Sequence, residues 1–178
     1  MVFARFIAVR WLSVVVVSLI LPKRIERRLR EESRRLGVTC EELVVEALSK
    51  FLNEPIDPQS RAEVHSTLSE KFMRDAEEFL KRCDYVQASE KAWGAASQMV
   101  KAVAAKEGRE IRSHRELHEY LSSIVERTGD IELRRTWSAA GELHRNFYEA
   151  WLPPELVKGY IRDVKELIGK LRKLLESE

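Results

Sequence analysis

The sequence is poor in the residues that build disulfide-rich or metal-bound domains. Its 178 residues include only two cysteines, Cys40 and Cys83, which form no Cys-x-x-Cys pair and have no histidine nearby at metal-ligand spacing. A disulfide framework and a structural zinc site are therefore not expected, although a single Cys40–Cys83 bridge remains open. Because such cysteine usage is typical of intracellular proteins, we expect the chain to be cytoplasmic and to hold no metal.

Long hydrophobic runs are also absent. Residues Trp11–Pro22 are uncharged and mostly apolar, but they number fewer than the roughly 20 residues that a membrane-spanning helix needs. A signal peptide would end in a small-residue cleavage site, and Leu21-Pro22-Lys23 is a poor one. We interpret this run as a β-branched strand and expect no membrane association, with an anchor or a signal sequence as the alternative.

The motifs of several enzyme classes are missing. The chain has no P-loop, no glycine-rich phosphate fingerprint, no paired His-Glu metal motif and no Ser-His-Asp arrangement. These absences argue against a nucleotide-hydrolysing enzyme, and we expect no cofactor. With only seven glycines and five prolines, the composition instead suits a helical protein.

The formal charge of +2 is too small to indicate a nucleic-acid partner by itself. The segment Lys23–Arg35, however, holds seven basic residues against three acidic ones, a local excess of four positive charges. Such a run is usually a solvated helix face. The alternative is a nucleic-acid patch, for which Arg27, Arg28 and Arg30 are the candidates.

The N-terminal part predicts a small strand-helix-helix module over residues 14–53. A strand over Val14–Pro22 precedes a helix over about Lys23–Leu36, and Thr39 with Glu42 forms a capping box for a second helix. This order resembles a ribbon-helix-helix unit, which must dimerise because one strand and two short helices cannot bury a core. The outward face of the strand is largely Ile and Val, which cannot hydrogen-bond to base edges, so we favour dimerisation over DNA reading. Residues 1–13 form an extension or a mis-assigned start.

Residues 57–178 predict a bundle of helices joined by short turns. Asp57, Asp84 and Ser113 are N-cap residues at the expected positions, while Gly108 and Pro153-Pro154 end helices. The chain is therefore expected to be mainly α, with the small module in front of an antiparallel bundle.

One bundle helix carries an alanine-rich face opposite a polar one. The polar residues follow the spacing 4, 3, 4, 3: Gln87, Lys91, Gly94, Gln98 and Lys101. They form either a solvated face or the polar wall of a binding groove, and Gly94 favours the groove because a mid-helix glycine often marks a close approach.

A later helix places a histidine on an aromatic stripe. His144 lies between Trp137 and Trp151 at helical spacing and beside Tyr148. An imidazole buried there should be neutral, with a lowered pKa if it lacks a partner. His144 and Tyr148 are therefore further candidates for the binding groove, with a purely structural histidine as the alternative.

Three segments together resemble the archaeal PaREP family of the first type: Asp84–Ala105, the pair Ser113-His114, and Leu143–Glu149. The resemblance covers about Arg61 to Leu175 and implies a HEPN-like antiparallel helical bundle, usually dimeric, with ties to RNA handling. It also raises one mechanism, because many HEPN ribonucleases carry Arg, four to six residues, then His across a dimer cleft and cleave RNA without metal. The candidate catalytic residues at that spacing are Arg109 with His114 and Arg112 with His118.

These observations favour a non-catalytic homodimer whose polar groove binds RNA, a nucleotide or a protein. The alternatives are a metal-independent, toxin-like ribonuclease and a DNA-binding regulator that acts through the N-terminal module.

Overall fold

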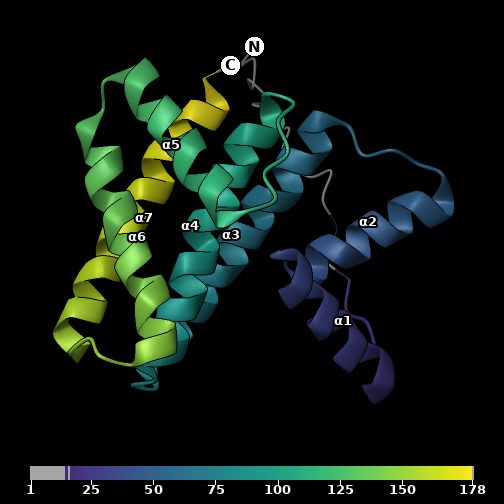
Figure 1. Cartoon of the computed structure of the whole chain (residues 1–178), viewed down its shortest axis with the longest axis horizontal. Helices are drawn as coiled ribbons and strands as arrows, with labels where there is room; N and C mark the ends of the chain where they lie inside the picture. The colour runs from purple at the N-terminus through teal and green to yellow at the C-terminus, as the bar shows by residue number, and fades with distance from the viewer. Residues whose placement is uncertain (1–14, 16, 178) are drawn as a thin grey trace, which may run out of the picture.

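The structure is a computed structural model that describes residue 15 and residues 17–177 (Figure 1). This part of the chain forms seven α-helices and no strand. The helices are α1 Lys23–Leu36, α2 Cys40–Leu52, α3 Pro58–Lys81, α4 Tyr85–Lys106, α5 His114–Thr128, α6 Ile131–Glu149 and α7 Pro154–Glu176. The expected mainly α class is confirmed. No helix in the described residues is both long and apolar enough to cross a membrane.

The helix starts lie where the capping residues predict them. Thr39 and Glu42 form the reciprocal capping box of α2. The side chains of Asp57, Asp84 and Ser113 accept hydrogen bonds from the first turns of α3, α4 and α5. Each cap satisfies a backbone N–H that has no partner inside the helix, which fixes where the helix begins.

The predicted N-terminal strand is wrong for the residues that the structure describes. Residue 15 and residues 17–22 belong to no strand, and the large apolar side chains Val15, Val17 and Ile20 are exposed. A strand needs a second extended segment to accept its hydrogen bonds, and the rest of the described chain is committed to helices and turns. Only the two helices of the expected module are found; Val14, Val16 and the extension over residues 1–13 lie outside the described residues.

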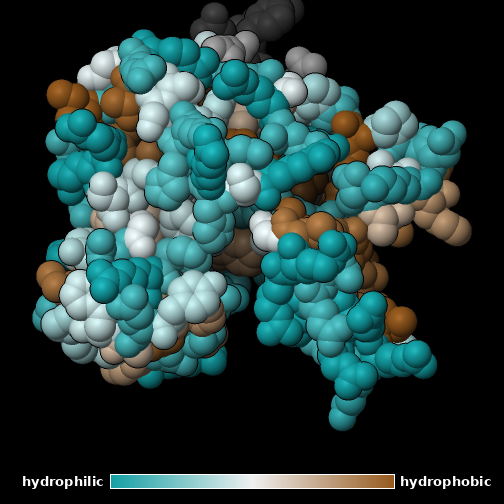
Figure 2. Space-filling model, in the orientation of Figure 1, coloured by the Kyte–Doolittle hydropathy of each residue, from teal (hydrophilic) through white to brown (hydrophobic). Residues whose placement is uncertain are grey.

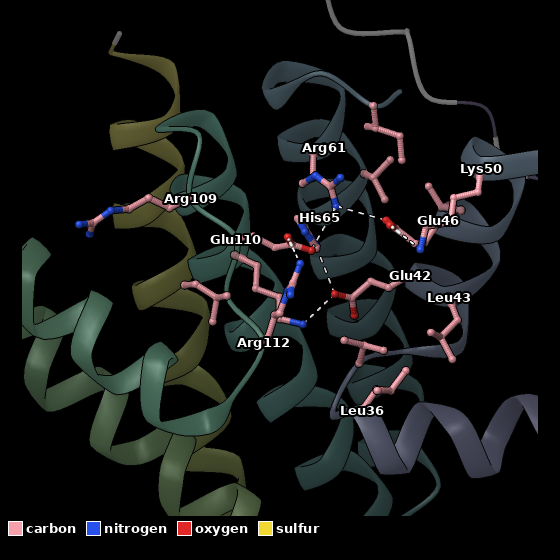
Figure 3. A pocket seen from close by; sticks show the side chains of 16 residues that line it. Leu36, Glu42, Leu43, Glu46, Lys50, Arg61, His65, Arg109, Glu110 and Arg112 are labelled. Carbon is pink, nitrogen blue, oxygen red and sulfur yellow. Dashed lines mark hydrogen bonds and ion pairs between the residues drawn. The ribbon is translucent and has the colours of Figure 1, made fainter. Parts of the chain in front are cut away.

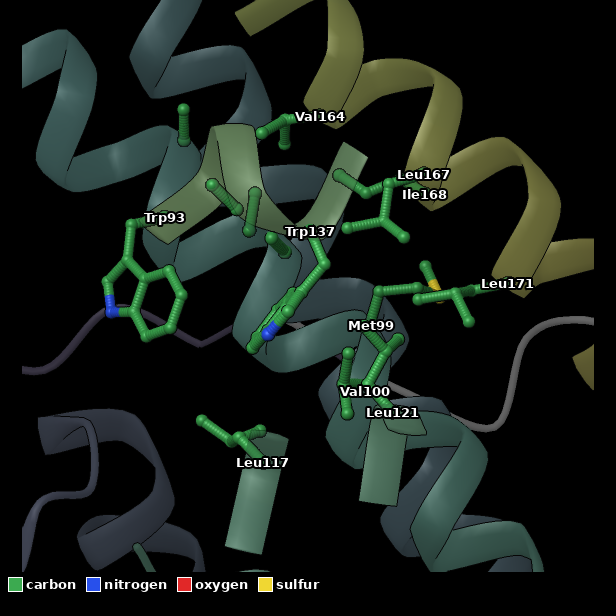
Figure 4. Packing of buried hydrophobic residues seen from close by; sticks show 14 of the residues in the cluster. Trp93, Met99, Val100, Leu117, Leu121, Trp137, Val164, Leu167, Ile168 and Leu171 are labelled. Atoms are coloured by element: carbon green, nitrogen blue, oxygen red, sulfur yellow. The ribbon is translucent and has the colours of Figure 1, made fainter. Parts of the chain in front are cut away.

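The core is built around α4, which packs against α3, α6 and α7. Its alanine face lies inside, since Ala88, Ala92, Ala95 and Ala96 have no exposed surface. Larger side chains from the other helices fill the space beyond this face, among them Trp137, Leu167 and Leu171 (Figure 4). Small residues on α4 let neighbouring helices approach closely, and burial of apolar surface on all sides stabilises the bundle.

Gly94 marks a close approach, but one within the chain. A Cβ at this position would lie 3.2 Å from Cδ2 of Phe72 on α3. Gly94 therefore serves the packing of α3 on α4.

The α1–α2 pair projects from the bundle (Figure 1). Neither helix fully buries a side chain against the described remainder of the chain, and Phe51 is 86 % exposed. Brown apolar surface is visible where the pair meets the bundle, beside a hollow (Figure 2). Polar side chains of α2 hold the pair against the bundle. The same helix forms one wall of a pocket.

Candidate functional site: a histidine–tryptophan cluster and a charged pocket

Three of the four histidines gather at the junction of α4, α5 and α6. We call this group the histidine–tryptophan cluster: Trp93 on α4, His114 and His118 on α5, and Trp137, His144 and Tyr148 on α6. The His144 ring stacks on Trp93 at 4.6 Å between centroids. Its edge contacts reach His114 at 4.8 Å and Tyr148 at 5.3 Å. His144 thus lies among aromatic side chains, as predicted, but its ring stacks on Trp93 of α4 and not on Trp151.

His144 is the most perturbed member of the cluster. Its Nδ1 is buried and has no hydrogen-bond partner in the described structure. Burial, with smaller contributions from the nearby His114 and His118, lowers the pKa of His144 to about 4. The imidazole is therefore neutral at pH 7, as expected for a histidine on an aromatic stripe without a partner.

His118 is fixed in one tautomer by a tryptophan. The indole Nε1–H of Trp137 donates to Nδ1 of His118 at 2.8 Å. A neutral His118 consequently carries its proton on Nε2. In this state the exposed nitrogen is a hydrogen-bond donor and not a base.

His114 lies at the first position of α5, where Ser113 provides the cap. Its ring is exposed on one side and touches the edge of Trp93 at 5.6 Å. Partial burial lowers the pKa of His114, with a smaller effect from His118. A neutral, accessible imidazole is able to accept a proton, which distinguishes His114 from His118.

The two candidate arginines do not join these histidines in one copy of the chain. The guanidinium of Arg109 lies 5.7 Å from the centre of the Tyr120 ring. Arg112 donates to Glu110 at 2.6 Å, and its backbone N–H donates to Glu116. Any Arg–His pair would therefore have to form between two copies. Nor does any group of three metal-ligating side chains occur among the residues described.

The candidate groove residues separate into different places. Gln87 belongs to the start of α4, where its backbone N–H donates to the cap Asp84. Lys91 lies 5.7 Å from the centre of the Phe72 ring. Tyr148 is 72 % exposed at the histidine–tryptophan cluster. Gln98 and Lys101, in contrast, are buried beneath α2.

A buried polar group joins α2 to the bundle. Glu42 accepts hydrogen bonds from Lys101 at 2.7 Å and from Gln98 at 2.9 Å, while Gln98 also meets Nδ1 of His65 at 2.7 Å. Burial alone raises the pKa of Glu42, but Lys101 and the Thr39 backbone N–H outweigh it, so the pKa is lowered. Burial is also the main reason that the pKa of His65 is lowered. The group thus holds one ion pair beside a neutral histidine.

Above this group lies a pocket of about 390 Å³ between α2, α3 and the segment that leads into α5 (Figure 3). Its charged side chains are Glu42, Glu46, Lys50, Arg61, Lys101, Arg109, Glu110 and Arg112. Its apolar side chains are Leu36, Val38, Leu43, Val45, Ile56, Val64 and Ile111. Sequence patterns identified Lys101, Arg109 and Arg112 as candidates but missed Glu42, Arg61 and His65 as partners. The capping box was the only available signal for Glu42, and it indicates a helix start and not a pocket.

The predicted nucleic-acid patch on α1 is partly neutralised. Arg28 pairs with Glu31 at 3.0 Å, and Arg30 pairs with Glu26. Arg27 is exposed and has no ion pair within the described residues. Two of the three candidate arginines therefore form ion pairs on their own helix face.

Fold and site together define a mainly helical protein in which a bundle presents a histidine–tryptophan cluster and a separate charged pocket. The chain matches the archaeal PaREP1/PaREP8 family over residues 64–168, more than half of its length, and it belongs to that family. The matched region runs from α3 into α7 and contains the whole histidine–tryptophan cluster. No curated protein and no solved structure matches the chain. The HEPN-like character of the bundle stays a prediction.

Proposed function

We propose that this protein is a homodimeric, non-catalytic helical module that binds single-stranded RNA or a nucleotide at the histidine–tryptophan cluster. The observation that carries the proposal is the convergence of three histidines on two tryptophans, with Tyr148 72 % exposed beside them. Unpaired bases stack on exposed aromatic rings and hydrogen-bond to nearby polar side chains. In the cluster, Tyr148 supplies the exposed ring and His114 and His118 supply exposed polar groups, while Trp93 and Trp137 are buried behind them.

We expect the end of α6 and Trp151, which follows it, to extend this face. Trp151 is 46 % exposed, and the Arg145 guanidinium lies 5.0 Å from the centre of its ring. Arg145 also pairs with Glu149, so the local charge is balanced. Because the pKa values of His114 and His144 are lowered and Arg145 is paired with Glu149, stacking should dominate binding. We expect a shallow salt dependence, since few phosphate charges would be neutralised.

The α1–α2 pair supports the dimer. Its exposed apolar side chains include Leu48, Phe51 and Leu52, which one copy leaves in water. Helix α1 is strongly basic, whereas α2 carries Glu41, Glu42 and Glu46 against Lys50. A second copy packed on this pair would cover the apolar side chains, whereas Glu41 and Glu42 are already paired with Lys71 and Lys101 of the same copy.

The binding proposal is tested by fluorescence polarisation with a labelled oligouridylate and with AMP. Substitution Tyr148→Ala or Trp151→Ala should each weaken binding about fivefold or more, because base–aromatic stacking contributes roughly 1–3 kcal/mol per base. The control Ile131→Ala removes an exposed side chain at the other end of α6 and should bind like wild type. Unchanged affinity in both aromatic variants would refute the proposed face.

The dimer is tested separately by sedimentation with the variant Phe51→Ser. We expect this variant to shift toward monomer while its circular dichroism spectrum stays helical, since Phe51 is outside the core. A wild-type chain that sediments as a monomer at all concentrations would refute the dimer and leave the binding face unaffected.

A metal-independent ribonuclease is the second candidate. It is favoured by one observation, the neutral and accessible His114 at 4.8 Å from His144. His114 would take the proton of a 2′-hydroxyl group, and Arg109 or Arg112 of the other copy would face the phosphate. The test is incubation of a mixed RNA pool in EDTA beside the double variant His114→Ala/His118→Ala. Cleavage by wild type alone supports the nuclease, and no cleavage by either protein leaves the binding module.

A further inference from the structure

The pocket between α2 and the bundle has a chemistry of its own, separate from the histidine–tryptophan cluster (Figure 3). We infer that it is a binding site for a small monocarboxylate with an aliphatic body, anchored by Arg61. The argument rests on the shape and lining of the pocket, on the state of each of its charges, and on the residue types that its lining omits.

The size and walls suit a small organic molecule. About 390 Å³ lies within the range of 300–1,000 Å³ that is usual for ligand pockets. One wall is aliphatic, with Leu36, Val38 and Leu43 from the α1–α2 side facing Ile111 on the bundle side. Such a wall can bury the hydrocarbon part of a ligand but cannot hydrogen-bond to it.

Three of the lining cations are already engaged. Lys101 is 6 % exposed and bonded to Glu42, and Arg112 is bonded to Glu110 at 2.6 Å. Lys50 lies 3.4 Å from Glu46. These ion pairs cancel in charge and leave no net attraction for an anion.

Arg61 is different. Its Nη1 forms long ion pairs with Glu46 at 3.7 Å and with Glu110 at 3.8 Å, but both distances are too long for a hydrogen bond. Its guanidinium therefore has donors that are available to a ligand. Arg109 also lines the pocket, but its side chain points away from the other labelled residues and lies over Tyr120 (Figure 3).

The resulting charge selects the ligand. With Arg109 turned away, four cations face three carboxylates, which leaves one positive charge, since His65 is neutral beside Lys101. A single carboxylate matches that charge and fits the forked geometry of a guanidinium. A phosphate monoester brings nearly two charges close to Glu46 and Glu110 and is disfavoured.

The residue types in the lining exclude stacking. Among the described residues that line the pocket there is no Phe, Tyr or Trp. The one imidazole in the lining, His65, is buried and bonded to Gln98, so a nucleobase would find no exposed aromatic face, whereas an alkyl chain needs only the aliphatic wall. The body of the ligand is therefore aliphatic, in contrast to the ligand proposed for the histidine–tryptophan cluster.

The test is isothermal titration of the full-length protein with butanoate, hexanoate and octanoate, beside hexanol, octanol, inorganic phosphate and AMP. Affinity should rise about fourfold per methylene until the pocket is filled, from the transfer free energy of a buried CH₂. Each alcohol should bind at least tenfold more weakly than the acid of equal chain length, because it cannot form the charged contact with Arg61.

Two variants separate this site from non-specific binding. The variant Arg61→Gln should lose at least tenfold in carboxylate affinity, while the control Arg74→Gln, on the exposed face of the same helix, should not. The variant Ile56→Trp should block the pocket without removing a charge. Equal binding of acids by wild type and Arg61→Gln, or equal binding of acids and alcohols, overturns the assignment. Tighter binding of AMP or phosphate than of octanoate also overturns it.

Discussion

The sharpest physical prediction concerns His144 and the pH dependence of stability. Because the folded pKa is about 4 and the ordinary value is 6.5, the unfolded chain binds this proton more tightly than the folded chain does. The free energy of unfolding therefore falls as the pH falls from about 6.5 toward 4. Below pH 4 the contribution of His144 no longer changes. The histidine contributes no loss above pH 7.

The magnitude follows from the two pKa values. At pH 5, linkage gives an upper limit of about 2 kcal/mol lost relative to pH 8. His144 is only half-buried, so solvent screening reduces the expected loss to about 1 kcal/mol. Substitution His144→Phe keeps the aromatic stacking on Trp93 and removes the titrating group.

Urea unfolding at pH 8 and pH 5 provides the measurement. The difference between the two pH values should be about 1 kcal/mol smaller in His144→Phe than in wild type. Other titrating groups, including His65 and Glu42, remain in both proteins and cancel in this comparison. The control Tyr148→Phe, which also changes the cluster without removing its histidine, should keep the full pH dependence. Equal pH dependence in wild type and His144→Phe would show that His144 is not a neutral, desolvated histidine.

Three further perturbations test the packing. Substitution Glu42→Gln should cost about 3 kcal/mol because it leaves the buried Lys101 ammonium without its counter-ion, and adding Lys101→Met should recover much of the loss; a cost below about 1 kcal/mol in urea unfolding would contradict the buried pair. Substitution Gly169→Ala should stabilise the protein by about 1 kcal/mol in thermal unfolding, since an added Cβ meets open space in mid-helix, and an unchanged midpoint would refute this. Substitution Gly94→Leu should destabilise the fold by about 1–3 kcal/mol through a clash with Phe72. The same variant should leave the dimer dissociation constant unchanged in sedimentation, and a weakened dimer would place Gly94 at the interface instead.

Local features were readable because their physical causes are local. Thr39, Asp57, Asp84 and Ser113 each cap a helix through a hydrogen bond that spans three residues, so neighbouring sequence suffices to place it. The alanine row of α4 likewise predicts a face that only other helices can cover. The prediction of an N-terminal strand was wrong for the opposite reason. A strand depends on hydrogen bonds to a distant partner segment, and a local sequence pattern does not show whether that partner exists.

The aromatic stripe predicted only half of the cluster. His144 and Tyr148 lie four residues apart on one helix, so their proximity follows from the helical repeat. Trp93 comes from α4 and His114 from α5, and no spacing in the sequence links them to His144. Their meeting depends on how three helices pack.

By itself, the sequence determined that this chain is mainly helical, where its helices begin, and which faces of them are apolar. Only the tertiary structure decided that Gly94 faces Phe72, that Glu42 pairs with Lys101 across 59 residues, and that Arg61 lies between Glu46 and Glu110. The reason is physical. Helix starts and faces are set by hydrogen bonds and periodicity over a few residues, whereas pockets and clusters are set by contacts between segments that are far apart along the chain.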